Sequence, residues 1–375
     1  MKKKPNLLLL IVLIMFPQFV ETIYSPALPD IAREFRVSSH QAALTISIYF
    51  IAFAIGVICW GILSDVIGRK KSMVWGLVTY GIGAITALLA KDFNMILVAR
   101  VIAAFGAAVG SIITQTILRD IYEKEELSRV FSIIGISLSI SPVIGFLTGG
   151  IATKSYGYSG VFMMVLWLAI VLIICTLLFL PETKRMSDTK PAIISTLNEL
   201  LHDKMIWISA FLVAFFNIML FSYYSIAPFL FDKAGYSAEE FGYSGILLAI
   251  GSLGGGVINK KLIYQKVPAQ RLIFLASVIA LLGGVGVLML QGSLWFLLPT
   301  LLIVIAFGIA IPNILSQALI KYKHIAGTAG AIFGLMYYVF IGLGLTISGL
   351  VQNFGLIITV FSLLSVFLIT MYKNR

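Results

Sequence analysis

Residues 61–70 read Gly61-Ile62-Leu63-Ser64-Asp65-Val66-Ile67-Gly68-Arg69-Lys70, a short polar turn between two long apolar runs. Gly61 permits close contact between helices, and Gly68 permits a tight turn. Asp65 can pair with Arg69 or face a helix N-terminus, where the helix dipole favours an anion. Arg69 and Lys70 are expected to face anionic lipid head groups. The stretch therefore suits a gate between two membrane helices.

The apolar runs on both sides of this turn continue along the whole chain. Of 375 residues, 60% are hydrophobic and only 11% are charged, whereas a soluble domain has about 25% charged residues. The apolar excess comes in segments of about 18 to 25 residues, long enough to cross ~30 Å of hydrocarbon as helix. The sequence therefore predicts an all-α membrane protein with twelve spans, at residues 7–28, 41–64, 72–90, 94–117, 129–151, 159–180, 205–231, 240–258, 271–290, 294–317, 326–350 and 353–372.

The basic residues alternate between the two sides of these spans. Alternate connections hold 21 of the 27 Lys and Arg residues, beginning with Lys2, Lys3 and Lys4. The positive-inside rule then puts both termini in the cytoplasm of a multi-pass inner-membrane protein. The net charge of +11 thus reports topology and not nucleic-acid binding. No A-x-A-like site follows the three lysines, so residues 7–28 are interpreted as a span and not as a cleaved signal peptide.

Patterns typical of enzymes, metal sites and pumps are missing from the sequence. No G-x-x-x-x-G-K-[ST] run occurs, which argues against ATP-driven pumping. Neither a convergent catalytic constellation nor the output domain of a sensor is present. We therefore expect no enzyme and no cofactor, and a non-transporting membrane sensor is the alternative from another class. The residues considered are Cys59 and Cys175, interpreted as packing residues inside spans, and His40, His202 and His324, which lie far apart in connections without metal-ligand spacing.

A polar stretch divides the twelve spans evenly. We expect residues 1–181 to form an N-terminal six-helix bundle, 182–204 a cytoplasmic central loop, and 205–375 a C-terminal six-helix bundle. Residues 192–201 in the loop are predicted to form a short amphipathic helix. Two bundles related by an axis along the membrane normal hold their substrate near mid-membrane, at their interface. Glycines four residues apart predict close helix packing, at Gly106/Gly110, Gly145/Gly149, Gly251/Gly255 and Gly330/Gly334.

Several of these stretches resemble a known family. The turn at 61–70 is similar to the loop 2–3 signature G-x-L-x-D-x-x-G-R-K of the major facilitator superfamily. The stretch Tyr24-Ser25-Pro26-Ala27-Leu28-Pro29-Asp30-Ile31 resembles the Y-x-P-x-x-P segment of its Bcr/CflA drug-resistance branch. Similar to that branch too are Arg100 with Gly106-Ala107-Ala108, Arg119-Asp120, Pro181-Glu182-Thr183, Ala227-Pro228-Phe229 and Gly327-Thr328-Ala329. The resemblance covers essentially the whole chain, and it implies proton-coupled export of small amphipathic drugs or antibiotics by alternating access.

The fifth span bears on the direction of transport. Its stretch Ser141-Pro142-Val143-Ile144-Gly145-Phe146 resembles the antiporter signature G-P-x-x-G-G, with Ser141 and Phe146 in place of two glycines. Pro142 removes a backbone hydrogen bond and bends the helix, while Gly145 leaves room for a neighbour. The resemblance implies export. An exporter of a siderophore or another metabolite, and a proton-coupled uptake transporter, are the alternatives.

Glu21 and Arg100 are the ionisable residues placed clearly inside spans, where a charge at mid-bilayer costs at least ~2.5–3.5 kcal/mol. Glu21 shares a helix face with Gln18 and Ser25. Desolvation favours the neutral form of a carboxyl group, so an acid in a poorly solvated cavity can take up and release a proton. We hypothesise that Glu21 carries the coupling proton and that Arg100 tunes it. The alternatives are a purely structural acid and an arginine that extends outward to the interface.

The resemblance places the branch's helix-1 acid at the position of Thr22, about 100° around the helix from Glu21. Other polar and aromatic side chains inside the spans are candidates for a substrate cavity. Aromatic walls with few polar groups suit lipophilic or cationic ligands, and packing inside the bundle is the alternative. The candidates are Gln18, Tyr24, Ser25, Ser111, Gln115, Ser139, Asn217, Tyr223, Tyr224, Asn313, Gln317, Tyr337 and Tyr338. We expect a monomer in the lipid bilayer that handles a small-molecule substrate and protons.

Overall fold

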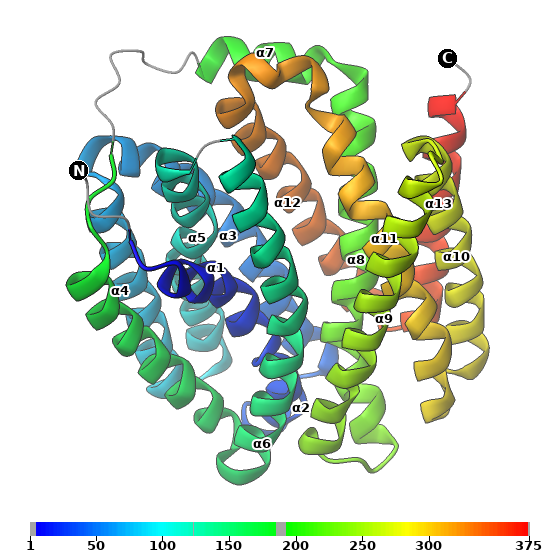
Figure 1. The fold of residues 1–375 in the computed structure, drawn as a ribbon. Coiled ribbons are helices and arrows are strands. Elements are labelled where there is room, and N and C mark those ends of the chain that lie inside the picture. The colour runs from blue at the N-terminus through cyan, green and yellow to red at the C-terminus, as the bar shows by residue number, and fades with distance from the viewer. Residues whose placement is uncertain (1–4, 123, 185–192, 374–375) are drawn as a thin grey trace.

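The computed structural model describes residues 5–122, 124–184 and 193–373, and the regular secondary structure in these ranges is helical. The first half contains α1 (Leu7–Thr22), the 3₁₀ turn η1 (Ser25–Ala27), α2 (Leu28–Glu34), α3 (Ser39–Ile67), α4 (Arg69–Leu88), α5 (Phe93–Ile121) and α6 (Lys124–Phe179). The second half contains α7 (Ile193–His202), α8 (Lys204–Lys233), α9 (Ala238–Tyr264), α10 (Ala269–Leu290), η2 (Leu294–Phe296), α11 (Leu297–Ala318), η3 (Ile320–Ile325), α12 (Ala326–Val351) and α13 (Phe354–Lys373). The predicted all-α class is confirmed (Figure 1).

The helices account for the twelve predicted crossings. Ten helical runs in the described ranges are long and apolar enough to span a membrane. The run in α6 contains two crossings, because Gly157, with φ 63°, interrupts the helix between them. The remaining crossing is α4, which packs against α5. Its glycines, threonines and basic first turn leave it less apolar than the ten.

The first crossing is longer and more broken than the single span predicted at 7–28. Helix α1 ends at Thr22, and η1 and α2 continue the crossing to Glu34. Pro26 lies in the first turn of η1 and Pro29 in the first turn of α2. Proline suits these positions because a first-turn N–H has no partner within the helix. The break leaves Tyr24 and Ser25 at the junction between α1 and η1.

The predicted amphipathic helix at 192–201 is confirmed as α7, within one residue at each end of the predicted range. It lies across the ends of the crossings at the top of Figure 1. Residues 185–192 of the predicted central loop lie outside the described residues. So do the basic residues Lys2, Lys3, Lys4, Arg185, Lys190 and Arg375.

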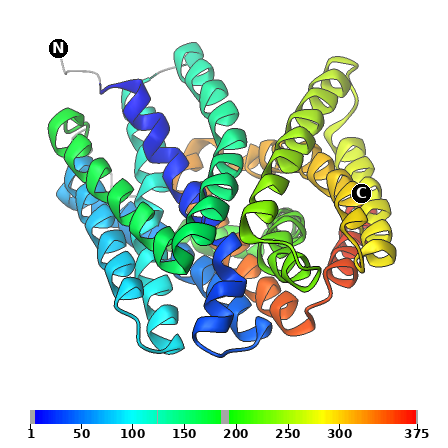
Figure 2. The ribbon, with the colours of Figure 1, turned by 90° about the horizontal axis from the view of Figure 1, so that it is seen from below.

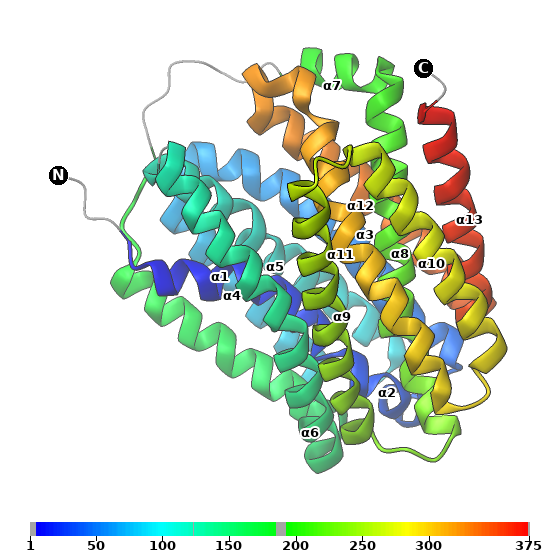
Figure 3. The ribbon, with the colours of Figure 1, turned by 45° about the vertical axis from the view of Figure 1, so that its right-hand side comes forward.

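Six crossings from each half of the chain pack with one another, and the two halves lie side by side (Figure 2). The halves meet mainly where α3 packs against α12 and where α6 packs against α9. We call the side of the molecule that carries residues 65–71, 119–120 and 182–184 the basic side. We call the opposite side, with residues 25–38, 152–158 and 232–240, the far side. Figure 3 shows α6 and α9 next to each other, with α7 beyond their basic-side ends.

Three of the four predicted glycine pairs lie at close helix contacts. A Cβ atom on Gly106 would come within 2.3 Å of the Tyr80 nitrogen, and one on Gly149 within 2.2 Å of the Ile23 carbonyl oxygen. A Cβ atom on Gly255 would come within 2.6 Å of the Ile305 oxygen. The prediction for Gly330 and Gly334 is wrong, because their nearest neighbours, at 3.8 and 3.7 Å, leave room for a side chain.

Candidate functional site

A central cavity of about 280 Å³ lies between the two halves of the molecule. Its wall combines aromatic rings with a few amide and hydroxyl groups and one carboxyl group. The lining residues that matter below are Gln18, Glu21, Tyr49, Phe50, Phe53, Ser111, Gln115, Asn217, Phe221, Tyr337 and Tyr338. The rings of Phe50 and Phe221 stack across the two halves, with centroids 4.6 Å apart. The cavity therefore offers flat aromatic surfaces and a single acidic group.

Glu21 is the acid in this cavity. Its helical spacing from Gln18 and Pro17 puts the three residues on one face of α1, and all three line the cavity. The residue is only 7% exposed, and its Oε1 atom is buried without a hydrogen-bond partner. Thr22, the position of the acid in the resembling branch, faces another way. Its hydroxyl donates to the carbonyl oxygen of Gln18, and it packs against Gly145 of α6.

Arg100 lies behind this wall and is 2% exposed. Its guanidinium carbon is 3.9 Å from the centroid of the Tyr24 ring and 4.2 Å from that of the Tyr49 ring. Its Nε donates to the Thr45 carbonyl oxygen at 3.4 Å, and its Nη2 atom is buried without a partner. Tyr49, whose ring Arg100 contacts, lines the cavity together with Glu21. The structure thus brings the two predicted coupling residues into one buried group.

A second cavity of about 250 Å³ adjoins the first, since Gln18, Leu138, Leu220 and Phe307 line both. Ser139, Pro142 and Tyr224 belong to its wall, together with residues of α9 and α11. Of the predicted cavity residues, eight line at least one of the two cavities: Gln18, Ser111, Gln115, Ser139, Asn217, Tyr224, Tyr337 and Tyr338.

The other predicted cavity residues lie elsewhere. Tyr24 faces Arg100, and the Ser25 hydroxyl donates to the Tyr224 carbonyl oxygen at 2.5 Å. The Tyr223 hydroxyl donates to the Ser244 hydroxyl. Asn313 is buried and donates to Asn259 at 2.7 Å, while Gln317 is exposed. Sequence reasoning missed Tyr49, Phe50, Phe53, Phe221 and Phe307, because an aromatic residue on a membrane helix faces lipid as readily as a cavity.

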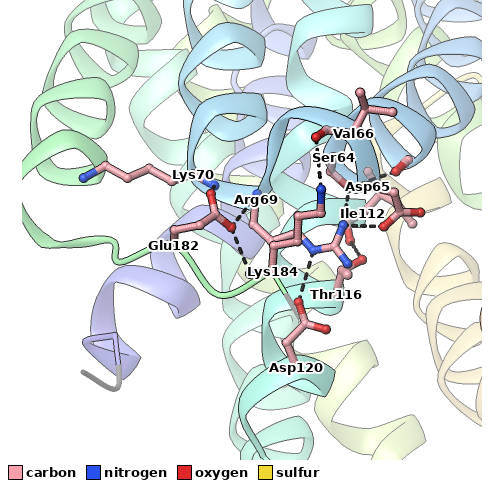
Figure 4. A network of polar contacts seen from close by, with 11 residues as sticks. Ser64, Asp65, Val66, Arg69, Lys70, Ile112, Thr116, Asp120, Glu182 and Lys184 are labelled. Atoms are coloured by element: carbon pink, nitrogen blue, oxygen red, sulfur yellow. Dashed lines mark hydrogen bonds and ion pairs between the residues drawn. The ribbon is translucent and has the colours of Figure 1, made fainter. Parts of the chain in front are cut away.

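The turn at 61–70 forms a compact charged network on the basic side (Figure 4). The Arg69 guanidinium pairs with Asp65 at 2.5 Å, as predicted, and with Asp120 at 3.1 Å. It also donates to the Ser64 hydroxyl. The expectation that Arg69 faces lipid head groups is wrong, because its side chain is 9% exposed and enclosed by these partners.

The other residues of the turn connect it to the end of the sixth crossing. The Glu182 carboxylate accepts from the backbone N–H groups of Arg69 at 2.9 Å and Lys70 at 3.2 Å, and so caps α4. The Lys70 ammonium donates to the Leu177 carbonyl oxygen at an exposed position. Gly68 has φ 97°, and a Cβ there would lie 2.4 Å from Glu182 Oε2, so the predicted tight turn is confirmed.

The Glu182 carboxyl group has a lowered pKa in this network. Although partial burial raises the pKa of Glu182, the N–H donors of Lys184, Arg69 and Lys70 lower it more, and the result lies below the ordinary value.

The expectation of a close helix contact at Gly61 is wrong, because a Cβ there would meet its nearest neighbour, Ile112, at an ordinary 3.7 Å. Gly61 instead lines a cavity of about 380 Å³ between α3, α5 and α12.

The antiporter-like stretch of α6 contacts both halves. The Ser141 hydroxyl donates to the Met15 carbonyl oxygen at 3.2 Å, and Gly145 faces Thr22. Pro142 lies inside the helix and lines the second cavity. The Phe146 ring, fully buried, contacts rings of the other half, with centroids 5.1 Å from Tyr224 and 5.4 Å from Phe241.

The far side is closed by contacts between the halves. Arg33 pairs with Asp232 at 2.6 Å, and Lys154 pairs with Glu239. A Cβ on Gly150 would come within 2.6 Å of the Ala238 carbonyl oxygen, so the two backbones nearly touch there. On the basic side, by contrast, the cavity that Gly61 lines lies between the ends of α3, α5 and α12. The conformation is therefore closed on the far side. Among the described residues, no group of three or more His, Cys, Asp or Glu side chains could hold a metal ion.

Known proteins are similar to this chain in sequence and in fold. The family model of the Major Facilitator Superfamily matches residues 10–345. An uncharacterised transporter of Rickettsia bellii is 30% identical over 100% of this chain and 98% of its own length. The bicyclomycin resistance protein homologue of Haemophilus influenzae is 24% identical over 86% of this chain and 83% of its own.

A solved structure with the same fold is that of a bacterial homologue of the human lysosomal transporter Spinster, in an inward-facing and occupied conformation. It is 18% identical, with a TM-score of 0.78, over 98% of this chain and 96% of that one. The match over most of the chain, together with twelve helical crossings around a central cavity, makes the protein a multi-pass membrane transporter of small molecules and not an enzyme. The chain belongs to the Major Facilitator Superfamily.

Proposed function

We propose that this transporter is a proton-coupled exporter of small amphipathic molecules, with Glu21 as the proton carrier. The observation that carries the proposal is the position of Glu21 on the wall of the central cavity, inside a membrane helix, with one carboxyl oxygen unpartnered. Burial without a direct counter-ion favours the neutral acid, and water in an open cavity favours the carboxylate. A cavity that opens alternately to the two sides would therefore load and release a proton at this group.

The wall of the cavity supports a planar, amphipathic substrate with at most one positive charge. Ring faces such as those of Phe50, Phe221 and Tyr337 attract flat apolar groups and cations. Asn217 and Gln115 add hydrogen-bonding groups that orient a ligand. A drug or antibiotic fits this description, and the similarity to a bicyclomycin resistance protein homologue agrees with it.

The remaining features follow from the charge pattern and the loop. We infer that the basic side is the cytoplasmic side of the inner membrane and that both termini lie there. We propose that residues 1–181 and 205–375 form two six-helix bundles, and that residues 182–204 are the loop that joins them. The protein works as a monomer, and the proton gradient takes the place of a cofactor.

Transport by inverted membrane vesicles tests the proposal. Cationic dyes, antibiotics and siderophores are offered with and without a proton gradient, and we expect gradient-dependent accumulation of at least one dye or antibiotic. Glu21→Gln should abolish it while the protein still inserts, and Glu34→Gln, which changes an exposed acid on the far side, should leave it intact. Equal accumulation with and without the gradient would exclude proton coupling. Accumulation of siderophores alone would favour a metabolite exporter. Gradient-driven loss of substrate from the vesicles would favour an uptake transporter.

A further inference from the structure

Arg100 presents a problem that the proposed function does not solve. It is a cation buried inside a membrane helix, and Glu21 is the nearby acid, with an unpartnered oxygen of its own. In the described structure no nitrogen of Arg100 lies within 4.0 Å of a Glu21 oxygen, so the two do not form a direct ion pair. Something else must stabilise the guanidinium.

Two tyrosine rings provide that stabilisation. The guanidinium carbon lies 3.9 Å from the Tyr24 centroid and 4.2 Å from the Tyr49 centroid, close to both ring faces. A cation over an aromatic face is attracted by the ring quadrupole, and more strongly when water is excluded. Both rings are buried, at 1% exposure each. The two faces thus act together as an uncharged substitute for a carboxylate.

The local structure fixes both rings. Tyr24 lies at the break that Pro26 imposes between α1 and η1, and its hydroxyl donates to the Thr45 hydroxyl at 2.8 Å. The Thr45 carbonyl oxygen in turn accepts from Arg100 Nε. Tyr49 lies one turn further along α3 and packs against Phe53. Tyr49 also lines the cavity beside Glu21, whereas Arg100 is not among the lining residues.

We propose that Tyr24 and Tyr49 are positioning residues that hold Arg100 between their rings and thereby keep it out of a direct ion pair with Glu21. This inference rests on the proposed role of Glu21 as the proton site. A guanidinium in direct contact would hold Glu21 as a carboxylate, and the group would no longer accept a proton at moderate pH. Held at a distance, the same charge tunes the acid without neutralising it.

The groups that act on this pair come from several helices. The charge of Glu21 interacts with Tyr49 of α3, Tyr224 of α8 and Tyr338 of α12. Arg100 of α5 is the cation whose charge reaches Glu21, and Tyr80 of α4 is within range of the Arg100 charge. The four tyrosines remain in place in the variants below, except where Tyr49 itself is changed. A shift in the titration of Glu21 can therefore be assigned to the position of Arg100.

Labelling with a carbodiimide tests the inference without knowledge of the substrate, because the reagent modifies protonated carboxyl groups in apolar surroundings. The full-length protein is labelled across a pH series, and mass spectrometry measures the modification of the peptide that contains Glu21. Glu21→Gln identifies the signal. We expect Tyr49→Phe, which keeps the ring, to match the wild type. Tyr49→Leu should move the labelling midpoint down by about one to three pH units, the effect of a cation at contact distance on an acid.

A double variant and a second position complete the test. Tyr49→Leu combined with Arg100→Gln should remove the downward shift, because no cation is left to pair with Glu21. Tyr24→Leu gives an independent measurement if the Tyr49→Leu protein does not accumulate. A wild-type midpoint in the leucine variants would overturn the inference and leave the proposed function standing. A shift in Tyr49→Phe as large as that in Tyr49→Leu would also overturn the inference, because the phenylalanine keeps the ring. A wild-type Glu21 that does not titrate in this assay would contradict the proposed proton role as well.

Discussion

The ring of Phe146 in α6 contacts the ring of Tyr224 in α8 edge-on, with centroids 5.1 Å apart and planes at 74°. The two residues belong to different halves of the molecule, and Phe146 occupies the last glycine position of the antiporter signature that this stretch resembles. The glycines of α9 make room for it, since a Cβ on Gly245 would lie 2.9 Å from the Phe146 Cβ. An aromatic side chain thus joins the halves where the signature has no side chain at all.

Phe146→Ala should open the far side. Phe146 contacts Tyr223, Tyr224 and Phe241. At about 0.5–1.5 kcal/mol per aromatic pair the loss is about 1.5–4.5 kcal/mol, which lowers the ratio of closed to open molecules at least tenfold. The readout is labelling of Ser252→Cys, in the second cavity, by a membrane-impermeant maleimide applied from the far side, with Cys59 and Cys175 replaced by serine. Phe215→Ala removes ring contacts within one half and should not increase labelling. An unchanged labelling rate in Phe146→Ala would show that this ring does not hold the halves together.

Asp120→Asn should destabilise the protein more than Asp65→Asn. Both carboxylates pair with Arg69, but the Asp120 side chain is 16% exposed and the Asp65 side chain 58%. An exposed pair contributes about 0–1 kcal/mol, whereas a hydrogen bond to a charged group in a shielded site contributes about 1.5–3 kcal/mol. Thermal unfolding of the purified protein in detergent measures the difference. The opposite order would mean that burial does not set the strength of this network.

Arg69→Lys should not restore the network, because a lysine ammonium cannot reproduce the planar fork of donors that reaches Asp65, Asp120 and Ser64 together. We expect a loss of about 1–3 kcal/mol in stability from unpaired buried groups. The same unfolding assay measures this loss, and Lys71→Arg, at an exposed position two residues further along α4, is the control. A lysine variant as stable as the wild type would show that only the positive charge of Arg69 matters, and not the shape of its guanidinium group.

The contribution of Glu182 should depend on pH. Its folded pKa lies below the unfolded value of 4.5, because the N–H donors at the start of α4 outweigh the effect of partial burial. The stabilisation is therefore fully present above the unfolded pKa and is lost as the pH falls through the folded value. The melting temperature of Glu182→Gln should lie below that of the wild type at neutral pH, and the gap should narrow in acid. Glu199→Gln, at an exposed position of α7, is the control and should show no such gap; a gap that persists in acid would contradict the capping role.

Phe50→Leu should weaken binding of planar aromatic substrates. The ring stacks on Phe221 at 19° between planes, and the two face the cavity together. Loss of one aromatic contact of about 0.5–1.5 kcal/mol raises the dissociation constant about two- to tenfold. Fluorescence titration with a cationic dye measures it, and Phe215→Leu, away from the cavity, is the comparison. Equal affinity in the wild type and Phe50→Leu would move the dye site elsewhere.

The sequence predicted the features that depend on local spacing. Runs of apolar residues gave the crossings, and four-residue spacing gave the pair between Asp65 and Arg69. Asp120 and Glu182, which complete the same network, lie 51 and 113 residues from Arg69 and could only be found in three dimensions. The span predicted at 7–28 is too short, because Pro26 and Pro29 each begin a new helical turn and the crossing continues to Glu34.

The cavity was harder to predict because membrane helices carry apolar residues on every face. Polar groups such as Gln18 and Asn217 stood out in the sequence and line the cavity. Asn313 stood out equally and bonds to Asn259 between two helices of one half. The aromatic residues that form most of the wall could not be recognised in the sequence. Tyr49 and Phe50 lie in an apolar run in which lipid-facing residues are of the same types.

The capping of α4 by Glu182 has a counterpart in the other half, where Asp203 accepts from the backbone N–H of Met205 and from the Tyr322 hydroxyl. Each half of the molecule thus has a helix capped by a carboxylate group at the basic side. Two polypeptides, one ending after Lys184 and one beginning before Ile193, should therefore assemble into a working protein when a cell makes them together. Transport by the pair of fragments would show that one continuous polypeptide is not required, and that the contacts between the halves are enough for assembly.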